Sequence, residues 1–562
     1  MGSVWTSSLV ALTLAGAAFV ATALITASPS DRYPQFSDVT AAAGLSGFRN
    51  KQGTPRKDYI LESIGGGAAF FDYDNDGWLD ILLVRGTDLE NYRKRGGEAV
   101  CALYRNNRDG TFTDVTKKTG IDAARGWGMG VAIADYNDDG FDDILITGYG
   151  RNFLFRNNAN GSFDEVAERA GLLSKGLWST GATFFDSNPD GLLDVYISRY
   201  VTFDAANPVP RSASCEYKGL GVFCGPQGFE SDPHSLYRNN GDGTFRDVSD
   251  AAGLRKAEGP HHGLGVIALD YDNDGRSDLY VGNDSTPNLL WHNMGNGRFV
   301  DVAVEKGVAF SADGREQASM GVEAGDLRNR GLLDLFVTNF SGQMNELYRN
   351  SAGHSFEDVT WDSGMALPAA PYLGWSAHMA DFGNSGWMDV FVVNGHVYPE
   401  VDTQPAGTNY RQKPLYFRNL RNGKFASTTP GAPFEKSYTG RGAAIGDFDN
   451  DGALDILINN IDGAPVLLRN KGTPGHNWLE VLLRGRPRNR NALGARVFVR
   501  VGGAIQMREI NGASGYLSSS SRRAHFGFGA NGQVDEVTII WPNGRKQLLN
   551  NVKTNQRLVI DE

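Results

Sequence analysis

Apolar and polar positions along the 562-residue chain alternate in short blocks bounded by glycine and aspartate. The most regular block is an apolar run directly after an acidic turn, as in FDYDNDGWLDILLV, which begins at Phe71. Short apolar runs bounded by turn residues are typical of β-strands. The acidic phrase occurs seven times, with its first aspartate at Asp72, Asp135, Asp186, Asp270, Asp326, Asp381 and Asp447. This recurrence, at a period of about fifty to eighty residues, indicates a repeat architecture.

A second phrase, roughly L-Y-R-N followed by a turn and F-x-D-V, keeps step with the first. Its first half occurs seven times, beginning at Leu103, Leu154, Leu236, Leu290, Leu347, Leu415 and Leu467. The F-x-D-V half follows only six of these strands, and one further copy begins at Phe36, ahead of them all. A ring that closes by letting the N-terminal strand complete the last unit explains both half-units, and radial repetition protects sheet edges. We therefore predict an all-β fold, a seven-bladed β-propeller over residues 34–470.

Each predicted blade has four short strands: a Gly-rich strand such as IGGGAAFF, the apolar strand after the acidic turn, the L-Y-R-N strand and the F-x-D-V strand. The small residues of the first strand are expected where the blades taper towards a crowded central channel. The third and fourth blades are separated by an insertion at residues 200–233.

These phrases resemble the FG-GAP and VCBS repeats of integrin α-subunit propellers and of many bacterial surface proteins. The resemblance covers most of the chain. The rhythm Gly-x-x-x-Ala-x-x-Asp-x-Asp-x-Asp-Gly is specific when it returns seven times in phase.

The acidic turn has the ligand chemistry of a calcium site. Ca²⁺ takes six to eight oxygen ligands in an irregular cage, and a D-x-D-x-D-G-x-x-D loop supplies carboxylates together with a backbone carbonyl. We expect five such sites, about five calcium ions in all. The predicted ligands are Asp72, Asp74, Asp76 and Asp80; Asp135, Asn137, Asp139 and Asp143; Asp186, Asn188, Asp190 and Asp194; Asp270, Asp272, Asp274 and Asp278; and Asp447, Asp449, Asp451 and Asp455.

Two turns depart from this pattern and are expected to hold no metal. One has Arg328 and Arg330 where acidic residues are expected, and the other has Gly383 and Ser385. In the first, a guanidinium could neutralise Asp326 and Asp334 in place of an ion. The alternative for all seven turns is that Asp and Gly serve only as turn residues. Four like charges in one turn argue against it, because each raises the energetic cost of the others unless a cation is present.

The charge of the chain is uneven. The formal net charge is −11, which five divalent ions would bring close to −1, and such acidity disfavours nucleic acid as a partner. Residues 476–562 contain 13 Lys and Arg against 6 Asp and Glu, a net of +7, whereas the preceding residues contain 41 against 59, a net of −18. This asymmetry and the alternating short strands predict a separate C-terminal domain, small and β-sandwich-like.

Residues 476–562 resemble the ASPIC/UnbV domain, and the motifs that carry the resemblance are NRNALGARV, GYLSSS, HFGFG and WPNG. With the propeller before it, the chain resembles a bacterial-type member of the cartilage acidic protein family, which implies an extracellular calcium-binding protein. An Arg, hydroxyl and aromatic group in this domain could bind a glycan or an acidic partner, although such residues are more often core or loop-clamping residues. The group comprises Arg496, Tyr516, Ser518, His525 and Trp541.

Cysteine usage and the N-terminus favour export. Cys215 and Cys224 lie in the insertion, where a disulfide could staple a loop that has no core of its own, whereas Cys101 is expected to be a buried thiol. Residues 1–30 are expected to be a signal peptide or an N-terminal membrane anchor, because an uncharged apolar run spans residues 4–27. The expected location is therefore periplasmic, cell-surface or secreted.

Three functions remain open from the sequence. The first is an adhesion or protein-interaction scaffold, rigidified by calcium, whose partner is an unknown surface protein or glycan. The second is a structural subunit of an envelope or extracellular complex, with the basic domain docked on an acidic partner. The third is a carbohydrate-active enzyme, for which the candidate groups are His261, His262, Asp284 and His396. We expect no enzymatic activity, since no nucleophile or phosphate loop accompanies these groups.

Overall fold

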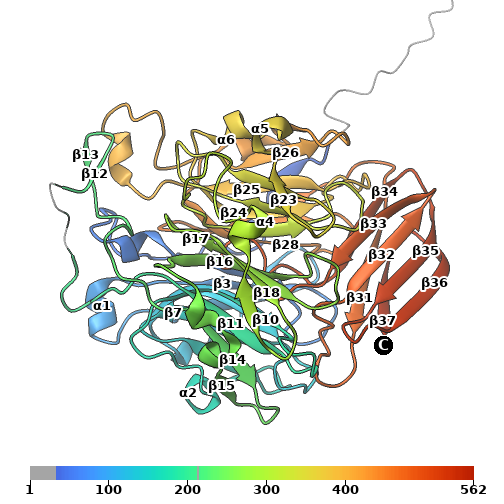
Figure 1. Ribbon diagram of the computed structural model, residues 1–562, viewed down its shortest axis with the longest axis horizontal. Coiled ribbons are helices and arrows are strands. Elements are labelled where there is room, and N and C mark those ends of the chain that lie inside the picture. The colour runs from blue at the N-terminus through green and yellow to red at the C-terminus, as the bar shows by residue number, and fades with distance from the viewer. Residues whose placement is uncertain (1–32, 210, 212–213) are drawn as a thin grey trace, which may run out of the picture.

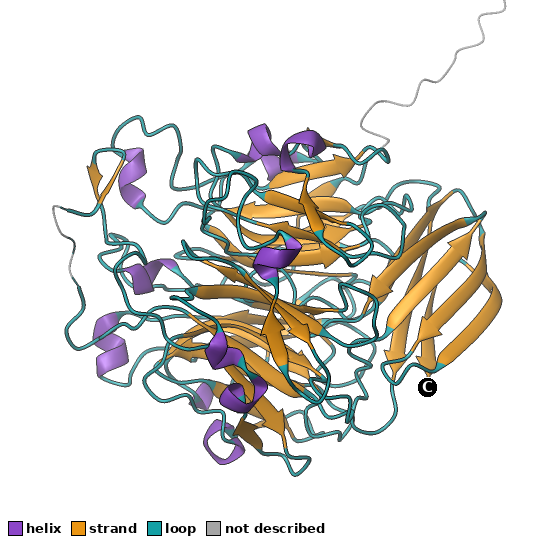
Figure 2. Cartoon of the chain, viewed as in Figure 1, coloured by secondary structure: helices purple, strands orange, loops and turns teal. Residues whose placement is uncertain are grey.

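The computed structural model describes residues 33–209, 211 and 214–562, and in it the chain forms a ring of β-sheets with a second, smaller β domain at one side (Figure 1). Strands dominate both parts, and helices are short segments between them (Figure 2). The all-β propeller fold predicted from the sequence is confirmed. The predicted signal peptide or anchor at residues 1–30 lies outside the described residues. No helix that the described residues form is long and apolar enough to cross a membrane.

The ring consists of seven four-stranded antiparallel sheets, here called blades 1 to 7 in chain order. Blades 1 and 2 comprise β2 (Ala68–Phe71), β3 (Asp80–Val84), β4 (Cys101–Asn106) and β5 (Phe112–Asp114), then β6 (Trp127–Ala134), β7 (Asp143–Tyr149), β8 (Phe153–Asn157) and β9 (Phe163–Glu165). Blades 3 and 4 comprise β10 (Ser179–Phe185), β11 (Asp194–Arg199), β14 (Ser235–Asn239) and β15 (Phe245–Asp247), then β16 (Gly263–Leu269), β17 (Asp278–Asn283), β18 (Leu289–Asn293) and β19 (Phe299–Asp301).

The remaining three blades complete the ring. Blades 5 and 6 comprise β20 (Val322–Gly325), β21 (Asp334–Val337), β22 (Glu346–Asn350) and β23 (Phe356–Asp358), then β24 (Gly374–Ala380), β25 (Asp389–Asn394), β26 (Leu415–Asn419) and β27 (Phe425–Thr428). Blade 7 comprises β28 (Gly440–Gly446), β29 (Asp455–Asn460), β30 (Val466–Asn470) and β1 (Phe36–Asp38).

The N-terminal strand closes the ring. Strand β1 pairs antiparallel with β30, with Phe36 opposite Asn470 and Asp38 opposite Leu468. The first strand of each blade also packs against the first strand of the next, and β28 packs against β2, so the series returns to its start. Closure in this way leaves no open edge between the first and last blades.

Small residues in the first strands permit close approach around the channel. A Cβ added to Gly67 would lie 2.2 Å from the Leu517 carbonyl oxygen, and one added to Gly442 would lie 2.4 Å from the Gly66 carbonyl oxygen. Separations below about 3.0 Å do not occur for real Cβ atoms. The glycines are therefore required by the space available.

The Asn of each L-Y-R-N strand is a clamp between neighbouring blades. In blade 1, Asn106 Nδ2 donates to the Leu79 carbonyl of its own blade at 2.9 Å and to the Phe448 carbonyl of blade 7 at 2.8 Å. The equivalent clamps in blades 2 to 7 are Asn157, Asn239, Asn293, Asn350, Asn419 and Asn470. Because each amide bridges two blades, the repeated Asn holds the ring together and satisfies buried carbonyls.

Short helices lie in the connections between strands. They are α1 (Leu89–Arg93), α2 (Ala167–Ala170), α3 (Ser249–Ala252), α4 (Ala303–Lys306), α5 (Thr360–Ser363) and α6 (Ala366–Ala369), with the 3₁₀ turns η2 (Ile60–Ser63), η3 (Ile121–Ala123), η4 (Leu254–Lys256), η5 (Pro399–Asp402) and η6 (Ala432–Glu435).

The insertion between blades 3 and 4 contains a small hairpin, β12 (Glu216–Tyr217) with β13 (Leu220–Gly221). The predicted disulfide between Cys215 and Cys224 is present and brackets this hairpin. Cys101 is a buried free thiol, as predicted, and burial raises its pKa to about 12.

The C-terminal domain, called the module below, has two sheets that enclose an apolar core. One sheet has the order β34 (Ala524–Gly529), β31 (Asn477–Arg484), β37 (Gln556–Asp561), and the other has the order β33 (Ala504–Glu509), β32 (Arg496–Val501), β35 (Gln533–Ile540), β36 (Lys546–Lys553). In Figure 1 the module lies on the side of the ring opposite the β12–β13 hairpin.

The module inserts residues 514–521, the channel segment, among the first strands of the blades. The carbonyls of Gly515 and Leu517 accept backbone bonds from Val322 of blade 5 at 3.1 Å and Val131 of blade 2 at 3.0 Å. Further bonds join the segment to blades 1 and 7. The module is therefore anchored in the channel by backbone pairing.

Candidate metal centres

The first aspartate of each acidic turn fixes the turn itself. In blade 1, the two carboxylate oxygens of Asp72 accept bonds from the backbone N–H groups of Asp76 at 2.9 Å and Gly77 at 2.8 Å. Gly77 has a φ of +86°, a conformation that glycine adopts readily. Asp326 and Asp381, in the two turns that lack the full pattern, accept the equivalent pair of bonds. The bonds between the first aspartate and the backbone of the turn therefore do not depend on the other predicted metal ligands.

The last aspartate joins the turn to the third strand. Asp80 Oδ1 accepts from the Asn106 backbone N–H at 2.8 Å, and its Oδ2 accepts from the Tyr73 N–H at 3.1 Å. In blades 5 and 6, Asp334 and Asp389 accept the bond from the third strand in the same way. The first and last aspartates therefore have a backbone role in every blade, and positions three and five distinguish the five complete turns.

Several predicted ligand atoms in the complete turns are buried with no hydrogen-bond partner among the described residues. They are Asp74 Oδ1, Asn188 Oδ1 and Asp449 Oδ1, all at the third position, and Asp278 Oδ2 at the ninth. Because leaving such an acceptor unsatisfied costs about 1–3 kcal/mol, these atoms require an additional partner. A hard cation such as Ca²⁺ fits an oxygen donor set of this kind.

Three turns bring their carboxylates close enough to share one ion. The oxygens of each group lie within 4.8 Å of one another, and the groups are Asp72, Asp74 and Asp80; Asp270, Asp272 and Asp278; and Asp447, Asp449 and Asp455. The turns of blades 2 and 3 have Asn at the third position and retain the same backbone clamps around Asp135 and Asp186. All five complete turns therefore have the same backbone bonds to the first aspartate, and three of them also bring their carboxylates together.

Burial raises the pKa of the predicted carboxylate ligands. The pKa rises to about 6 for Asp72 and Asp186, to about 7 for Asp135, Asp194 and Asp278, and to about 8 for Asp447. Desolvation is the largest cause in each case, and neighbouring carboxylates add to it. Negative charge in these turns is energetically unfavourable, and a bound divalent cation would offset it.

Basic residues of the third strand face two of the turns from outside, a contact that the sequence reasoning missed. Arg105 lies 2.7 Å from Asp74 Oδ2 and 3.1 Å from Asp76. Arg469 contacts Asp449 Oδ2 and Asp451 in blade 7. In both turns the guanidinium contacts one oxygen of the aspartate at the third position, and the other oxygen has no hydrogen-bond partner among the described residues. The sequence signal that could have predicted this contact is the Arg that recurs in the L-Y-R-N strands.

The turn of blade 5 uses arginine in a different way. Arg328 donates to both oxygens of Asp334 at 3.2 and 2.9 Å, as the hypothesis of neutralisation without an ion requires. It was predicted to serve Asp326 as well, but Asp326 instead accepts the backbone N–H groups of Arg330 and Gly331.

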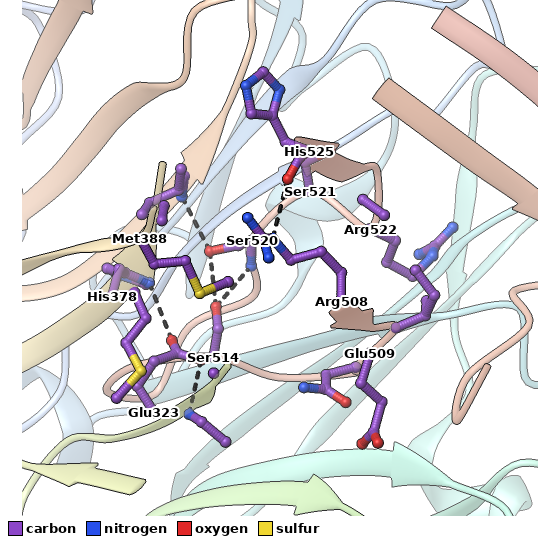
Figure 3. A pocket seen from close by; sticks show the side chains of 18 of the residues that line it. Glu323, His378, Met388, Arg508, Glu509, Ser514, Ser520, Ser521, Arg522 and His525 are labelled. Atoms are coloured by element: carbon purple, nitrogen blue, oxygen red, sulfur yellow. Dashed lines mark hydrogen bonds and ion pairs between the residues drawn. The ribbon is translucent and has the colours of Figure 1, made fainter. Parts of the chain in front are cut away.

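The module supplies a second cation to blades 5 and 6. A cavity of about 150 Å³ lies where the module meets these blades, and Arg508 lines it together with Glu323, His378, Ser514 and Ser520 (Figure 3). Burial lowers the pKa of Arg508 to about 10, and the charges of Asp381 and Asp326 oppose this shift. A guanidinium therefore lies close to the two aspartates whose turns lack the calcium pattern.

Three further arginines of the module contact acidic turns of other blades. Arg496 lies 3.2 Å from Asp270, and Arg522 lies 2.9 Å from Asp142. Arg523 donates to the Gly77 carbonyl at 3.0 Å. Part of the basic charge of the module thus faces the acidic turns of the same chain.

The residues proposed as a binding group in the module do not converge. Tyr516 stacks edge-on against Trp375 in the channel, with ring centroids 4.7 Å apart. Ser518 Oγ accepts from the Ala68 backbone, and His525 Nε2 lies 2.7 Å from Asn384 Oδ1. Trp541 is buried in the module core. These side chains, like Arg496, hold the module together or join it to the propeller.

The candidate catalytic histidines lie in two different environments. His262 Nδ1 lies 3.0 Å from the backbone carbonyl of Asp284, whose carboxylate accepts the Tyr200 hydroxyl at 2.5 Å. His261 packs against His234, with ring centroids 6.1 Å apart. His396 lies among aromatic rings, including Tyr217 at 5.1 Å between centroids.

Comparison with known proteins identifies two kinds of unit in the chain. The family model for FG-GAP-like repeats matches residues 72–146, 135–197, 222–281, 270–337, 326–392 and 406–458. The family model for ASPIC and UnbV matches residues 485–562. Both resemblances drawn from the sequence are therefore confirmed.

Curated relatives resemble the chain over most of its length. Cartilage acidic protein 1 of Mus musculus is 27% identical over 519 residues, which are 87% of this chain and 72% of the relative. Cartilage acidic protein 1 of Homo sapiens is 28% identical over 517 residues, 87% of this chain and 71% of the relative. A solved structure from Agrocybe aegerita, described as specifically recognising non-reducing terminal N-acetylglucosamine, aligns with 71% of this chain and 87% of its own, at 16% identity and a TM-score of 0.40.

Proposed function

The chain belongs to the FG-GAP-like repeat family, and we propose that it is a calcium-binding propeller that acts outside the cytoplasm as an adhesion or protein-interaction scaffold. One observation carries the proposal: ligand atoms of the acidic turns, such as Asp74 Oδ1 and Asp449 Oδ1, are buried inside clusters of carboxylates and have no hydrogen-bond partner in the part of the chain that the structure describes. Calcium bound there supplies positive charge and joins the two ends of each turn. It thereby rigidifies the turn.

The expected residence outside the cytoplasm is supported by the disulfide between Cys215 and Cys224, since disulfides persist in oxidising compartments. The resemblance to the cartilage acidic proteins also supports a location outside the cytoplasm, because it implies an extracellular calcium-binding protein. Sites of extracellular modules bind Ca²⁺ with dissociation constants of about 10⁻⁴ to 10⁻³ M. At such affinities the turns fill in a calcium-rich exterior.

Calcium titration of two matched variants tests the metal sites. Asp451 in blade 7 and Ser385 in blade 6 occupy the same turn position, and each accepts a bond from the backbone N–H two residues later. Both Asp451→Ala and Ser385→Ala remove that bond, but only the first removes a predicted ligand. We expect about five calcium equivalents for the parent protein and Ser385→Ala, and one fewer for Asp451→Ala. Equal stoichiometry in all three proteins, or no binding at all, would overturn the proposal.

The scaffold role is tested at the cell surface. The exported protein is cross-linked on intact cells in millimolar calcium and again in excess chelator. We expect a cross-linked species of defined mass that requires calcium and is lost with Asp451→Ala. A protein that remains uncross-linked in both conditions would contradict the scaffold role.

A further inference from the structure

Blade 4 differs from the other blades at the residue before its clamp asparagine. That position is Arg in six blades, namely Arg105, Arg156, Arg238, Arg349, Arg418 and Arg469. In blade 4 it is His292, on β18. The position is the one from which Arg105 and Arg469 reach their acidic turns, so the exchange places an imidazole beside a metal-binding turn.

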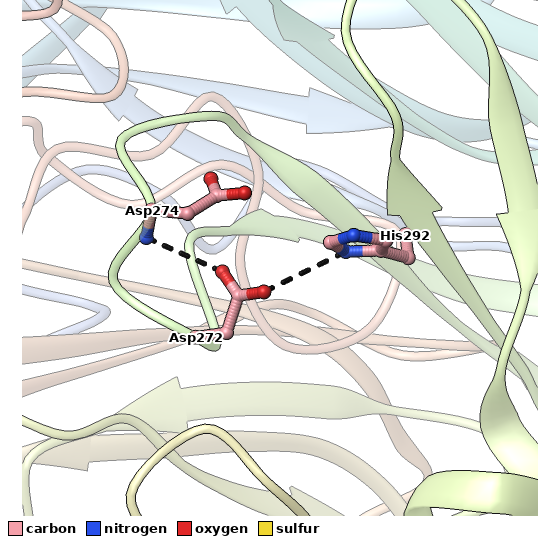
Figure 4. A group of neighbouring side chains, drawn as sticks. All are labelled: Asp272, Asp274 and His292. Carbon is pink, nitrogen blue, oxygen red and sulfur yellow. Dashed lines mark hydrogen bonds and ion pairs between the residues drawn. The ribbon is translucent and has the colours of Figure 1, made fainter.

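His292 points into the acidic turn of its blade (Figure 4). Its Nδ1 lies 3.2 Å from Asp278 Oδ1 and 3.7 Å from Asp272 Oδ2. Ligand atoms of His292, Asp272 and Asp274 lie within 4.8 Å of one another, and Asp272 also belongs to the carboxylate group of the same turn. One nitrogen donor and several carboxylate oxygens therefore share a single site.

The exchange changes which ions the turn can bind. A guanidinium is always charged and has no lone pair to donate, so it can only compete with a cation. A neutral imidazole is a good ligand for divalent ions such as Zn²⁺, whereas Ca²⁺ takes oxygen ligands. The blade 4 turn is thus the one complete turn in the described residues whose third strand offers nitrogen to a metal.

Two arginines reduce the oxygen atoms that calcium could use in blade 4. Arg496 of the module lies 3.2 Å from Asp270 Oδ2, and Arg276 forms an ion pair with Asp274. Asp278 is fully buried, and its Oδ2 has no hydrogen-bond partner among the described residues. The acceptor that is left without a partner therefore lies beside the imidazole.

From this geometry we infer that the blade 4 turn is a site for a divalent first-row transition-metal ion of the Zn²⁺ class, held by His292 with Asp272 and Asp278. The inference rests on the proposed function, because it assumes that the acidic turns bind metal ions. The other four complete turns remain calcium sites. In a solution that contains both ions, the chain is expected to hold one transition ion and about four calcium ions.

The test is a Zn²⁺ titration of the full chain, stripped with chelator and then equilibrated with millimolar calcium. Calorimetry gives affinity, and elemental analysis after dialysis counts both metals. We expect one Zn²⁺ equivalent in the presence of excess calcium. Co²⁺ serves as a second probe, because its visible absorption reports the coordination geometry of the bound ion.

Three variants identify the site. His292→Arg introduces the residue found in the other six blades, and we expect it to fold and to bind Zn²⁺ at least about 100-fold more weakly, the upper end of what loss of a supporting residue costs. His292→Gln is the second variant, should the arginine disturb folding. Arg469→His in blade 7 is expected to add a second Zn²⁺ equivalent, because Asp447, Asp449 and Asp455 form the matching carboxylate group.

The outcomes separate the inference from the proposed function. Calcium binding without a Zn²⁺ equivalent, or a Zn²⁺ equivalent that survives in both His292 variants, overturns the inference alone. A Zn²⁺ equivalent that depends on His292, in a protein that binds no calcium, supports the inference and overturns the proposed calcium scaffold.

Discussion

Replacing Tyr516 with alanine should release the channel segment from the propeller. Tyr516 is fully buried and packs against Trp375, whose ring also carries the Arg441 guanidinium at 4.1 Å. The aromatic ring is the largest side chain of residues 514–521 and contacts the apolar cluster at the centre of the ring. Its removal leaves a cavity that the surrounding strands cannot easily fill.

The magnitude follows from the buried ring. Truncation of a buried aromatic residue to alanine costs about 3–5 kcal/mol, of which an aromatic pair contributes about 0.5–1.5 kcal/mol. At 1.4 kcal/mol per factor of ten, the equilibrium for opening of the channel segment should rise by about 100-fold to 4,000-fold. The propeller blades keep their own cores, so the effect should be confined to the module and its contacts.

Hydrogen exchange measures this opening. Backbone amides of the channel segment, such as that of Ser519, which donates to the Ala68 carbonyl at 3.0 Å, exchange only when the segment leaves the channel. We expect peptides from this segment to exchange at least about 100-fold faster in Tyr516→Ala, while peptides from the outer strands of the blades stay unchanged.

Tyr516→Phe is the matched control. It keeps the ring and removes only the hydroxyl, which is buried without a hydrogen-bond partner among the described residues, so no hydrogen bond is lost. Its exchange should rise by less than about tenfold. If Tyr516→Ala exchanges within about twofold of the parent protein, the reasoning that the buried ring anchors the module is wrong.

Two further predictions concern the acidic turns and the ring. In chelator, stability should fall as pH rises from about 5 to 8: burial raises the pKa of Asp72 to about 6 and of Asp447 to about 8, so the native state binds more protons than the unfolded chain in this window. Thermal midpoints across this range measure the effect, and a midpoint that rises with pH would contradict it. Asn470→Ala should lower the free energy of unfolding by about 2–5 kcal/mol, because it leaves two buried carbonyls without their donor. Urea unfolding checks this against Asn422→Ala, an exposed turn variant expected to change stability by less than about 1 kcal/mol.

The repeat architecture could be predicted because its signals are local. Aspartate and glycine at fixed spacing specify a turn, and the extra F-x-D-V strand at Phe36 had a single place to pair, beside the last L-Y-R-N strand. The positions of the candidate ligands within each turn follow from the same spacing. These features need no knowledge of distant contacts.

Other parts of the site depend on contacts that spacing does not specify. Arg469 reaches Asp449 because the third strand passes the turn in one particular register. Residues 514–521 read as a Ser-rich loop, and nothing in their composition indicates that they enter the channel. Arg508 lies near the turns of blades 5 and 6 only because the module docks in one orientation. Such contacts are set by the tertiary arrangement.

The central claim is that calcium completes the acidic turns, and thermal unfolding with a calcium count tests it most directly. The protein is unfolded in calcium and in excess chelator, and bound calcium is counted after dialysis against a calcium buffer. At a calcium concentration 100 times the dissociation constant, each occupied site contributes about 2.7 kcal/mol to native stability. We predict about five ions per chain and a clearly higher midpoint in calcium. No bound ion and an unchanged midpoint would show that aspartates such as Asp74 and Asp449 only shape the turns.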